Sequence, residues 1–173
     1  MNLKGRAALF GLALSFPLDY FTKWLVNENL AFGDQHTVIA GFFYLTHVRN
    51  TGAAFGLFSD GPADIRLSFF IGTSVIAIGI IVSFYRKLAP GEWLSALALG
   101  FILGGALGNL HDRIVHHEVV DFLHFKLWGG YSWPDFNLAD SFIVVGVAVL
   151  LLELLATEGE TSSAADGGGT SSA

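Results

Sequence analysis

The stretch WLSALALGFILGGALGNL, residues 93–110, decides the fold class, because it contains no charged side chain. As a helix rising about 1.5 Å per residue, it would cover about 27 Å, close to the thickness of a membrane's hydrocarbon layer. A backbone in lipid must satisfy its own hydrogen bonds, which a helix does. Gly100, Gly104 and Gly108 recur every four residues and would give one smooth face for close helix packing. The stretch therefore predicts a packed, membrane-spanning helix.

Three further apolar stretches of similar length, residues 5–26, 65–85 and 138–157, indicate four spans in all. Of the 173 residues, 53% are hydrophobic and only 14% are charged, against about 25% charged residues in soluble domains. We expect a membrane all-α fold with a small β element. Residues 1–157 would form one four-helix transmembrane domain, and residues 158–173 a disordered, polar tail rich in glycine and serine.

The short connections predict the orientation of these spans. Lys4 and Arg6 precede the first span, and Arg86 and Lys87 lie between the second and third. Positive clusters in short loops mark the cytoplasmic side. We therefore expect both termini in the cytoplasm and the two long connections, residues 27–64 and 111–137, on the outer side.

Both outer connections contain segments with the composition of strands. Residues 37–48 (TVIAGFFYLTHV) and 118–125 (EVVDFLHF) are rich in β-branched and aromatic side chains, and Asn50-Thr51-Gly52 is a turn signal. Together they predict a small extracytoplasmic sheet, or cradle, lying on the outer membrane surface.

Ionisable residues inside a span are costly and therefore informative. Asp19 and Lys23 are spaced i,i+4 and can pair on one helix face. The simplest interpretation is a mutually neutralising pair that holds helices together. Asp140 is the third residue of the fourth span, where it could cap the helix N-terminus or take part in chemistry.

A second acid, Asp121, lies in the apolar run Val-Val-Asp-Phe-Leu of the same outer region. It could point to water, or be buried with a raised pKa. Two carboxylates brought together can share one proton, which is the chemistry of aspartic proteases. Asp112 and Asp135 occupy the same connection, so the pattern alone does not choose the pair.

The composition also argues against several other site types. With no cysteine there is no thiol nucleophile or thiolate metal site, and the nine Lys and Arg form no basic stripe for nucleic acid. Four histidines crowd the second outer connection, but no H-E-x-x-H motif is present. We expect no metal, no organic cofactor and no nucleic-acid partner.

Several ordered motifs give the chain a specific resemblance. They are Asp19-x-x-x-Lys23, the run 50–56 (NTGAAFG), the run 105–113 (GALGNLHDR), the run 119–122 (VVDF) and the run 136–141 (FNLADS). Over residues 9–157 the sequence resembles the lipoprotein signal peptidases, the bacterial signal peptidase II family. In one place it differs: His117 stands four residues before Asp121, where the family usually has glycine.

This resemblance implies a multi-pass aspartic endopeptidase of the bacterial inner (cytoplasmic) membrane, acting near the periplasmic face. It would cut the signal peptide from a prolipoprotein just before the diacylglyceryl-modified cysteine. Asp121 and Asp140 would be the catalytic dyad. Asn50, Gly52, Asn109, Arg113, Asn137 and Ala139 would line the substrate site, with Asp19, Lys23 and Asp112 as structural support. Implied partners are the lipid-modified prolipoprotein, membrane lipids and inhibitors like the cyclic peptide globomycin; we expect a monomer.

Two other classes of function stay open on the residues alone. A small transporter component could use Asp19, Lys23 and Asp140 as an ion relay, although four spans are few for a transporter. A non-catalytic scaffold could bind lipid or lipoprotein without cutting, although a degenerate enzyme would be expected to have lost one of the two aspartates.

Overall fold

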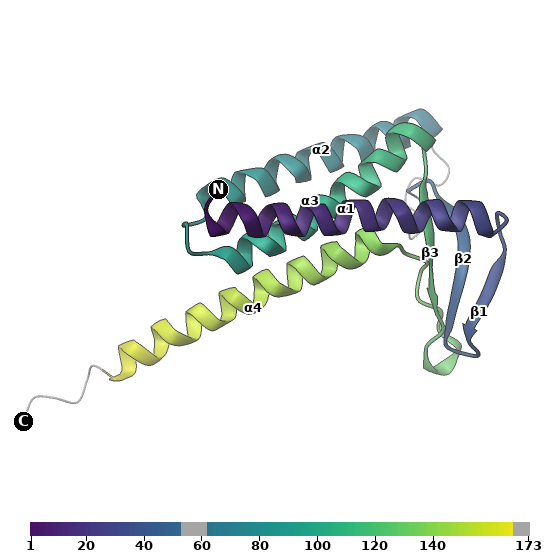
Figure 1. Ribbon diagram of the computed structural model, residues 1–173. Coiled ribbons are helices and arrows are strands. Elements are labelled where there is room, and N and C mark those ends of the chain that lie inside the picture. The colour runs from purple at the N-terminus through teal and green to yellow at the C-terminus, as the bar shows by residue number, and fades with distance from the viewer. Residues whose placement is uncertain (53–61, 168–173) are drawn as a thin grey trace, which may run out of the picture.

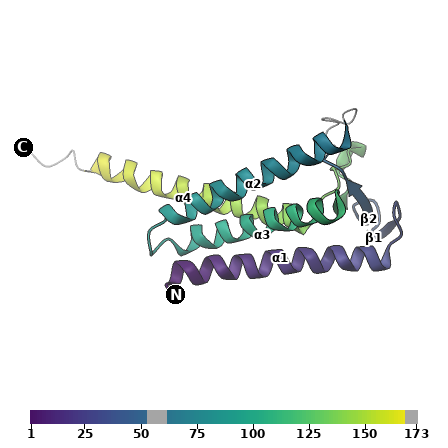
Figure 2. The same ribbon diagram turned by 90° about the horizontal axis from the view of Figure 1, so that it is seen from above.

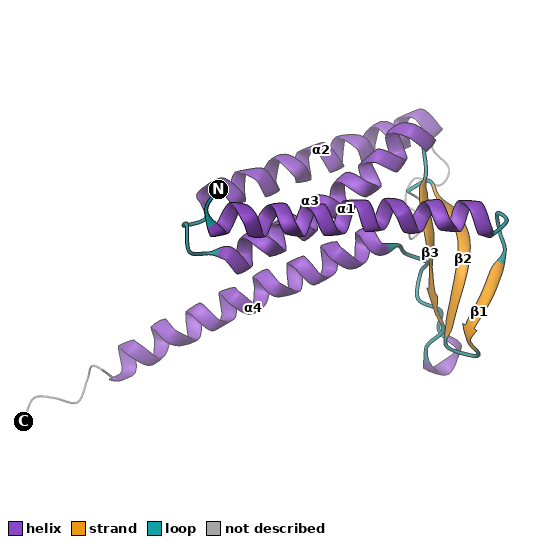
Figure 3. Cartoon of the chain, in the orientation of Figure 1, coloured by secondary structure: helices purple, strands orange, loops and turns teal. Residues whose placement is uncertain are grey.

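The computed structural model describes residues 1–52 and 62–167, with side chains up to residue 156. Four long helices and a three-stranded sheet make up the fold (Figure 3). In chain order the elements are α1 (Leu3–Asn29), β1 (Gln35–Ile39), β2 (Phe43–Asn50), α2 (Ala63–Lys87), α3 (Trp93–His116), β3 (Val119–Phe125), the short 3-10 helix η2 (Trp128–Gly130) and α4 (Leu138–Gly167).

Helix α3 is the centre of the bundle, and its small residues explain how closely its neighbours approach (Figure 2). A Cβ added at Gly100, Gly104 or Gly108 would lie 2.4 Å, 1.8 Å and 2.4 Å from atoms of α1. Gly105 is equally close to α4, since its Cβ would lie 2.4 Å from the backbone oxygen of Ala139. The four-residue glycine repeat is thus the α1-packing face of α3.

The outer surfaces of the helices are apolar. By length and composition α2, α3 and the Leu138–Ala156 part of α4 can cross a membrane, among the residues that the structure describes. On α2 only Ile81 is buried, and large apolar side chains such as Ile76 are exposed. A soluble protein would not leave a 25-residue helix this apolar and uncovered. Helix α1 is of similar length but carries Lys4, Arg6, Asp19 and Lys23.

The sheet lies across one end of the bundle. Its strand order is β1-β2-β3, antiparallel throughout, and its strands run across the direction of α1 (Figure 1). Val120 and Phe122 of β3 pack on Val26 near the end of α1. At the opposite end of the bundle, Lys4 Nζ donates to the backbone oxygen of Leu88 at 2.6 Å, so the start of α1 lies beside the α2–α3 turn.

Several boundaries differ from the sequence-based expectation. Residues 37–48 form a hairpin rather than one strand, because Gly41 turns the chain with a φ of +78°. Helix α3 continues past 110 to His116, so Asp112 and Arg113 are helical rather than in a loop. Helix α4 extends to Gly167, past residue 158, where the disordered tail was expected to begin. Residues 53–56 of the NTGAAFG motif and residues 168–173 lie outside the described residues.

His117 ends α3 in the left-handed conformation, with φ 63° and ψ 5°, and its N–H donates to the backbone oxygen of Arg113 at 3.2 Å. Glycine adopts this conformation without the steric cost of a Cβ. The histidine therefore keeps the turn that a glycine would make, at a cost in conformational energy.

We expect His117→Gly to raise the free energy of unfolding by about 0.5–1 kcal/mol. The matched control is His116→Gly, inside the last helical turn, which should lower it by a similar amount. Thermal unfolding in detergent measures both. Equal destabilisation by the two substitutions would contradict the strain at His117.

Candidate functional site: a buried carboxylate–amide network

Lys23 of α1 holds two carboxylates in the interior. Its Nζ lies 2.8 Å from Asp19 Oδ2 and 2.9 Å from Asp112 Oδ2, and it donates to Asn109 Oδ1 at 2.9 Å. All four side chains are at least nine-tenths buried. The ammonium group thus uses its three donors on three acceptors, so one cation joins α1 to two positions of α3.

Asp19 also joins α1 to the start of α4. Its Oδ1 accepts the backbone N–H of Ala139 at 2.8 Å, in the first turn of α4. A carboxylate is favoured there by the partial positive charge of a helix N-terminus. The pairing of Asp19 and Lys23 predicted from their spacing is therefore present, within a larger network than the spacing indicated.

Asn137 and Asp140 cap α4 reciprocally. The backbone N–H of Asp140 donates to Asn137 Oδ1 at 3.0 Å, and the backbone N–H of Asn137 donates to Asp140 Oδ2 at 3.3 Å. This is the arrangement of a capping box, with aspartate in the third helical position. The other oxygen of Asp140, Oδ1, accepts Asn109 Nδ2 at 2.8 Å. Asp140 is therefore a capping residue, and it is also joined to the Lys23 network.

Asp121 is joined to the same network from the sheet. Asn137 Nδ2 donates to its Oδ1 at 2.8 Å, and Asn50 Nδ2 donates to its Oδ2 at 2.8 Å. The side chain does not point to water, because the residue is only 2% exposed. Asn137, itself completely buried, donates to the Asp121 carboxylate from its side-chain amide and to the Asp140 carboxylate from its backbone N–H, so one residue connects the two carboxylates.

Burial raises the pKa of Asp121 to about 7. The main cause is the loss of hydration of the charged carboxylate, and the negative charge of Asp140 adds to it. The hydrogen bonds from Asn50 and Asn137 favour the ionised form and limit the rise. Asp121 can therefore hold or release a proton near neutral pH.

The turn after β2 fits closely under α2. Gly52 has a φ of +94°, and its N–H donates to Asn50 Oδ1 at 2.8 Å, which fixes the amide that contacts Asp121. A Cβ at Gly52 would lie 2.1 Å from the ring of Phe70. The guanidinium of Arg113 lies 5.5 Å from the centre of the same ring, and it donates to the backbone oxygen of Asn109 at 3.2 Å. Phe70 was not expected from the sequence, where it is one apolar residue in a span.

A groove opens on the sheet side of Asp121, with a volume of about 310 Å³. Arg49, Asn50, Pro134 and Asp135 line it together with Asp121, and we name it the Asp121 groove. The groove connects the buried carboxylate of Asp121 with the surface of the protein.

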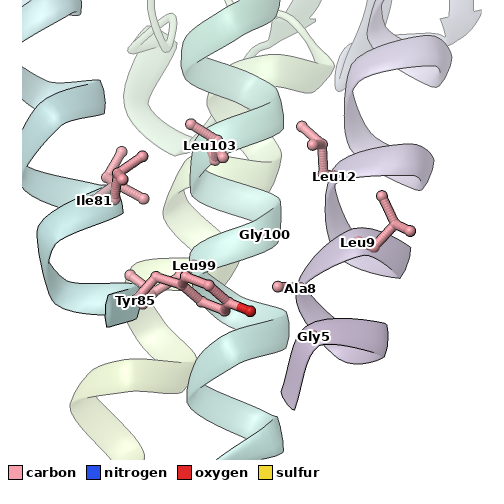
Figure 4. Close-up of a pocket in the computed structure, with 10 residues that line it drawn as sticks. Gly5, Ala8, Leu9, Leu12, Ile81, Tyr85, Leu99, Gly100 and Leu103 are labelled. Atoms are coloured by element: carbon pink, nitrogen blue, oxygen red, sulfur yellow. The ribbon is translucent and has the colours of Figure 1, made fainter. Parts of the chain in front are cut away.

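A second cavity, of about 240 Å³, lies between α1, α2 and α3. Figure 4 shows the hydroxyl end of Tyr85 of α2 pointing toward Ala8 of α1, with Ile81 of α2 and Leu12 of α1 on either side of α3. Its lining includes no Asp, Glu, Lys, Arg or His, so it offers no acid–base chemistry.

The network brings together most of the residues named from the sequence. Asp121 and Asp140 are both bonded to Asn137, and Asp112 forms an ion pair with Lys23. Asn137 and Ala139 are completely buried, so here they position other groups rather than present a surface to a substrate. In the part of the chain that the structure describes, no three His, Asp or Glu side chains are grouped so as to hold a metal ion.

Comparison with known proteins assigns the chain to a family. The family model described as Signal peptidase (SPase) II matches residues 12–156. The chain belongs to this family. The lipoprotein signal peptidase of Listeria monocytogenes serotype 4a is 43% identical over 144 residues, covering 83% of this chain and 90% of that protein. That of Bacillus pumilus is also 43% identical, over 80% of this chain and 85% of its own length.

Solved structures agree with the family assignment. A bacterial membrane enzyme matches with a TM-score of 0.76 at 33% identity, covering 86% of this chain and 92% of the other. A second bacterial membrane enzyme matches with a TM-score of 0.74 at 32% identity, covering 91% of this chain and 90% of the other. The resemblance seen in the sequence motifs is thereby confirmed, and with it a peptidase of the signal peptidase II family.

Proposed function

We propose that this member of the signal peptidase II family is an aspartic endopeptidase with Asp121 and Asp140 as its catalytic dyad. It removes the signal peptide from a diacylglyceryl-modified prolipoprotein by cutting before the lipidated cysteine. The observation that carries the proposal is that Asn137 bonds to both carboxylates, to Asp121 through its side-chain amide and to Asp140 through its backbone N–H. The negative charge of Asp140 contributes to the raised pKa of Asp121, so the two carboxyl groups are coupled and can act as a pair that holds one proton.

The two environments suggest different roles for the two acids. Asp140, in the first turn of α4, accepts hydrogen bonds from Asn109 and from the backbone of Asn137, which hold its carboxylate in place to act as the base. Asp121, buried and with a pKa of about 7, is the partner suited to carry the proton. These are the general base and general acid that amide hydrolysis requires.

The reaction follows from these roles. The Asp140 carboxylate takes a proton from water, and the resulting hydroxide attacks the scissile carbonyl carbon. Protonated Asp121 gives its proton to the carbonyl oxygen, forming a neutral tetrahedral diol. As the C–N bond breaks, the proton held by Asp140 goes to the cysteine nitrogen, and a hydroxyl of the diol returns its proton to Asp121. Peptide and lipidated cysteine amine leave, and both carboxyl groups are restored.

The arrangement of charges and aromatic side chains supports an outward-facing site. Lys4, Arg86 and Lys87 gather at the end of the bundle opposite the sheet. With these cations in the cytoplasm, the dyad and the sheet lie at the outer face. The sheet's far end exposes Trp128, Tyr131 and Trp133, residue types that favour the membrane interface. We propose that α1 is the fourth span, with Asp19 and Lys23 paired in the protein interior. The protein would be a monomer of the bacterial cytoplasmic membrane, with both termini in the cytoplasm.

A cleavage assay in detergent tests the proposed activity. We expect the purified protein to cut a diacylglyceryl-modified prolipoprotein at the bond before the cysteine, as measured by the mass of the released signal peptide. The same prolipoprotein without its lipid is the control substrate. Binding of the lipidated substrate without cutting would indicate a scaffold, and ion flux in proteoliposomes without cutting would indicate a transporter component.

The pKa of Asp121 predicts the alkaline side of the pH profile. Above pH 7 the dyad loses its shared proton, so the cleavage rate should fall by about tenfold per pH unit.

The free energy of unfolding should also decrease as the pH rises. Between the ordinary aspartate pKa of 3.8 and about 7, the folded state holds a proton that the unfolded state has released. The free energy of unfolding contributed by this group therefore decreases as pH rises through that window.

Initial rates between pH 5 and 9, with thermal unfolding at each pH, check this prediction. Substrate binding measured at the same pH values separates proton loss at the dyad from weaker binding. A cleavage rate that stays constant from pH 6 to pH 9 would contradict a dyad with Asp121 as the proton carrier.

A further inference from the structure

The Asp121 groove contains one acidic side chain that the proposed mechanism does not use. Asp135 lines the groove beside Asp121, on the segment that leads into α4. Two neighbours hold it: the hydroxyl of Thr46 donates to its Oδ1 at 2.6 Å, and His124 Nδ1 lies 3.2 Å from the same atom. Its Oδ2 accepts no hydrogen bond from any residue within 1–52 and 62–156.

The cation on the opposite wall of the groove is already engaged. Arg49 Nη1 lies 3.3 Å from Glu118 Oε1, Nη2 donates to Asn27 at 2.9 Å, and Nε donates to His47 Nε2 at 3.1 Å. The ion pair with Glu118 offsets the charge of Arg49, and the three partners together fix the orientation of its guanidinium group. Among the residues described, Asp135 thus has no Lys or Arg partner, and unlike Asp121 it has no role in the proposed mechanism.

The position of the groove indicates which part of a substrate would enter it. The groove is built from β2, β3 and the segment before α4, at the end of the bundle that carries the sheet (Figure 1). A signal peptide would extend from the scissile bond into the membrane, alongside the helices. The residues after the cysteine would extend the other way, over the sheet and past Asp135.

We propose that Asp135 is a specificity-determining residue, which selects for the charge of the side chain that follows the lipidated cysteine. The inference rests on the proposed function and adds a substrate preference to it. The half-buried carboxylate of Asp135, whose Oδ2 accepts no hydrogen bond from the described residues, favours Lys or Arg at that position and disfavours Asp or Glu. An ion pair at such a partly exposed site contributes only a modest free energy, but it distinguishes a cationic side chain from an anionic one.

Three lipidated prolipoprotein peptides that differ only in the residue after the cysteine provide the test. That residue is Lys, Gln or Asp, and kcat/KM is measured for each with the full chain in detergent at low salt. For wild type we expect kcat/KM for the Lys peptide to exceed that for the Asp peptide by about three- to tenfold. Added salt should reduce the ratio.

Asp135→Asn removes the charge but keeps an oxygen that can accept from Thr46. It should bring the Lys-to-Asp ratio of kcat/KM close to one, and this ratio, rather than the rate for any single peptide, is the readout. The matched control is Asp34→Asn, an exposed acid on the chain leading into β1, outside the groove. That variant should keep the wild-type ratio.

Each outcome separates this inference from the proposed function. If Asp135→Asn cuts the Gln peptide and keeps the wild-type ratio, Asp135 does not select substrates, and the peptidase function stands. If folded wild type cuts none of the peptides, the proposed function is wrong. The affinities of the same peptides for wild type and Asp135→Asn then test the role of Asp135. Equal affinities of wild type for the Lys and Asp peptides would overturn the inference.

Discussion

Asp121→Asn and Asp140→Asn should each lower turnover by at least about 10³-fold in a protein that still folds. Asparagine keeps the shape of the side chain and one acceptor oxygen, but it can neither take a proton from water nor deliver one to a carbonyl. At position 140 the retained oxygen can still accept a hydrogen bond at the start of α4. The chemistry is therefore removed while most of the network is kept.

Turnover at saturating substrate, with thermal unfolding of each variant, measures this effect. Asp34→Asn is the control for loss of an acidic side chain away from the network and should keep wild-type turnover. Loss of folding in a variant would leave its turnover uninterpretable for the dyad, so Asp121→Glu and Asp140→Glu serve as a second pair. They keep the charge but displace the carboxylate, and we expect low but measurable turnover.

Lys23→Met should have the largest effect on stability, lowering the free energy of unfolding by about 3–5 kcal/mol. Lys23 is 3% exposed and lies within 3 Å of Asp19 and Asp112. Its removal leaves two carboxylates buried beside each other without a cation. Since Asp19 also holds the first turn of α4, the damage should reach the helix that carries Asp140.

Combining Lys23→Met with Asp19→Asn and Asp112→Asn should recover much of this stability, because no buried charge is then left unpaired. Lys87→Met, at an exposed position at the end of α2, is the matched control and should unfold near the wild-type temperature. Thermal unfolding in one detergent compares all four proteins. A Lys23→Met variant as stable as wild type would show that the buried pair contributes little.

The apolar runs were sufficient to predict the helices, because each of α2, α3 and α4 is long and almost uniformly apolar. They did not predict where α3 ends. Residues 111–113 (His-Asp-Arg) are polar, and they stay helical because Asp112 has a buried cation, Lys23, from another helix. A partner 89 positions away leaves no local signal in the sequence.

The same limit applies to the site. The spacing of Asp19 and Lys23 predicted their pairing, since i,i+4 residues share a helix face. For Asp121 the alternatives of water or burial stayed open, because a short apolar run does not say which of its side chains another element covers. Pairing with β2, which brings Asn50 to Asp121, settles it in favour of burial. The bridging role of Asn137 depends on three segments meeting, and only the family resemblance drew attention to this residue.

Cleavage of one diacylglyceryl-modified prolipoprotein by wild type, Asp121→Asn and Asp140→Asn, side by side in detergent, tests the central claim most directly. The released peptide is identified by mass, and folding of all three proteins is checked by thermal unfolding. The dyad predicts a single cut before the cysteine by wild type and no product from either folded variant. Product formed at the wild-type rate by either folded variant would contradict it.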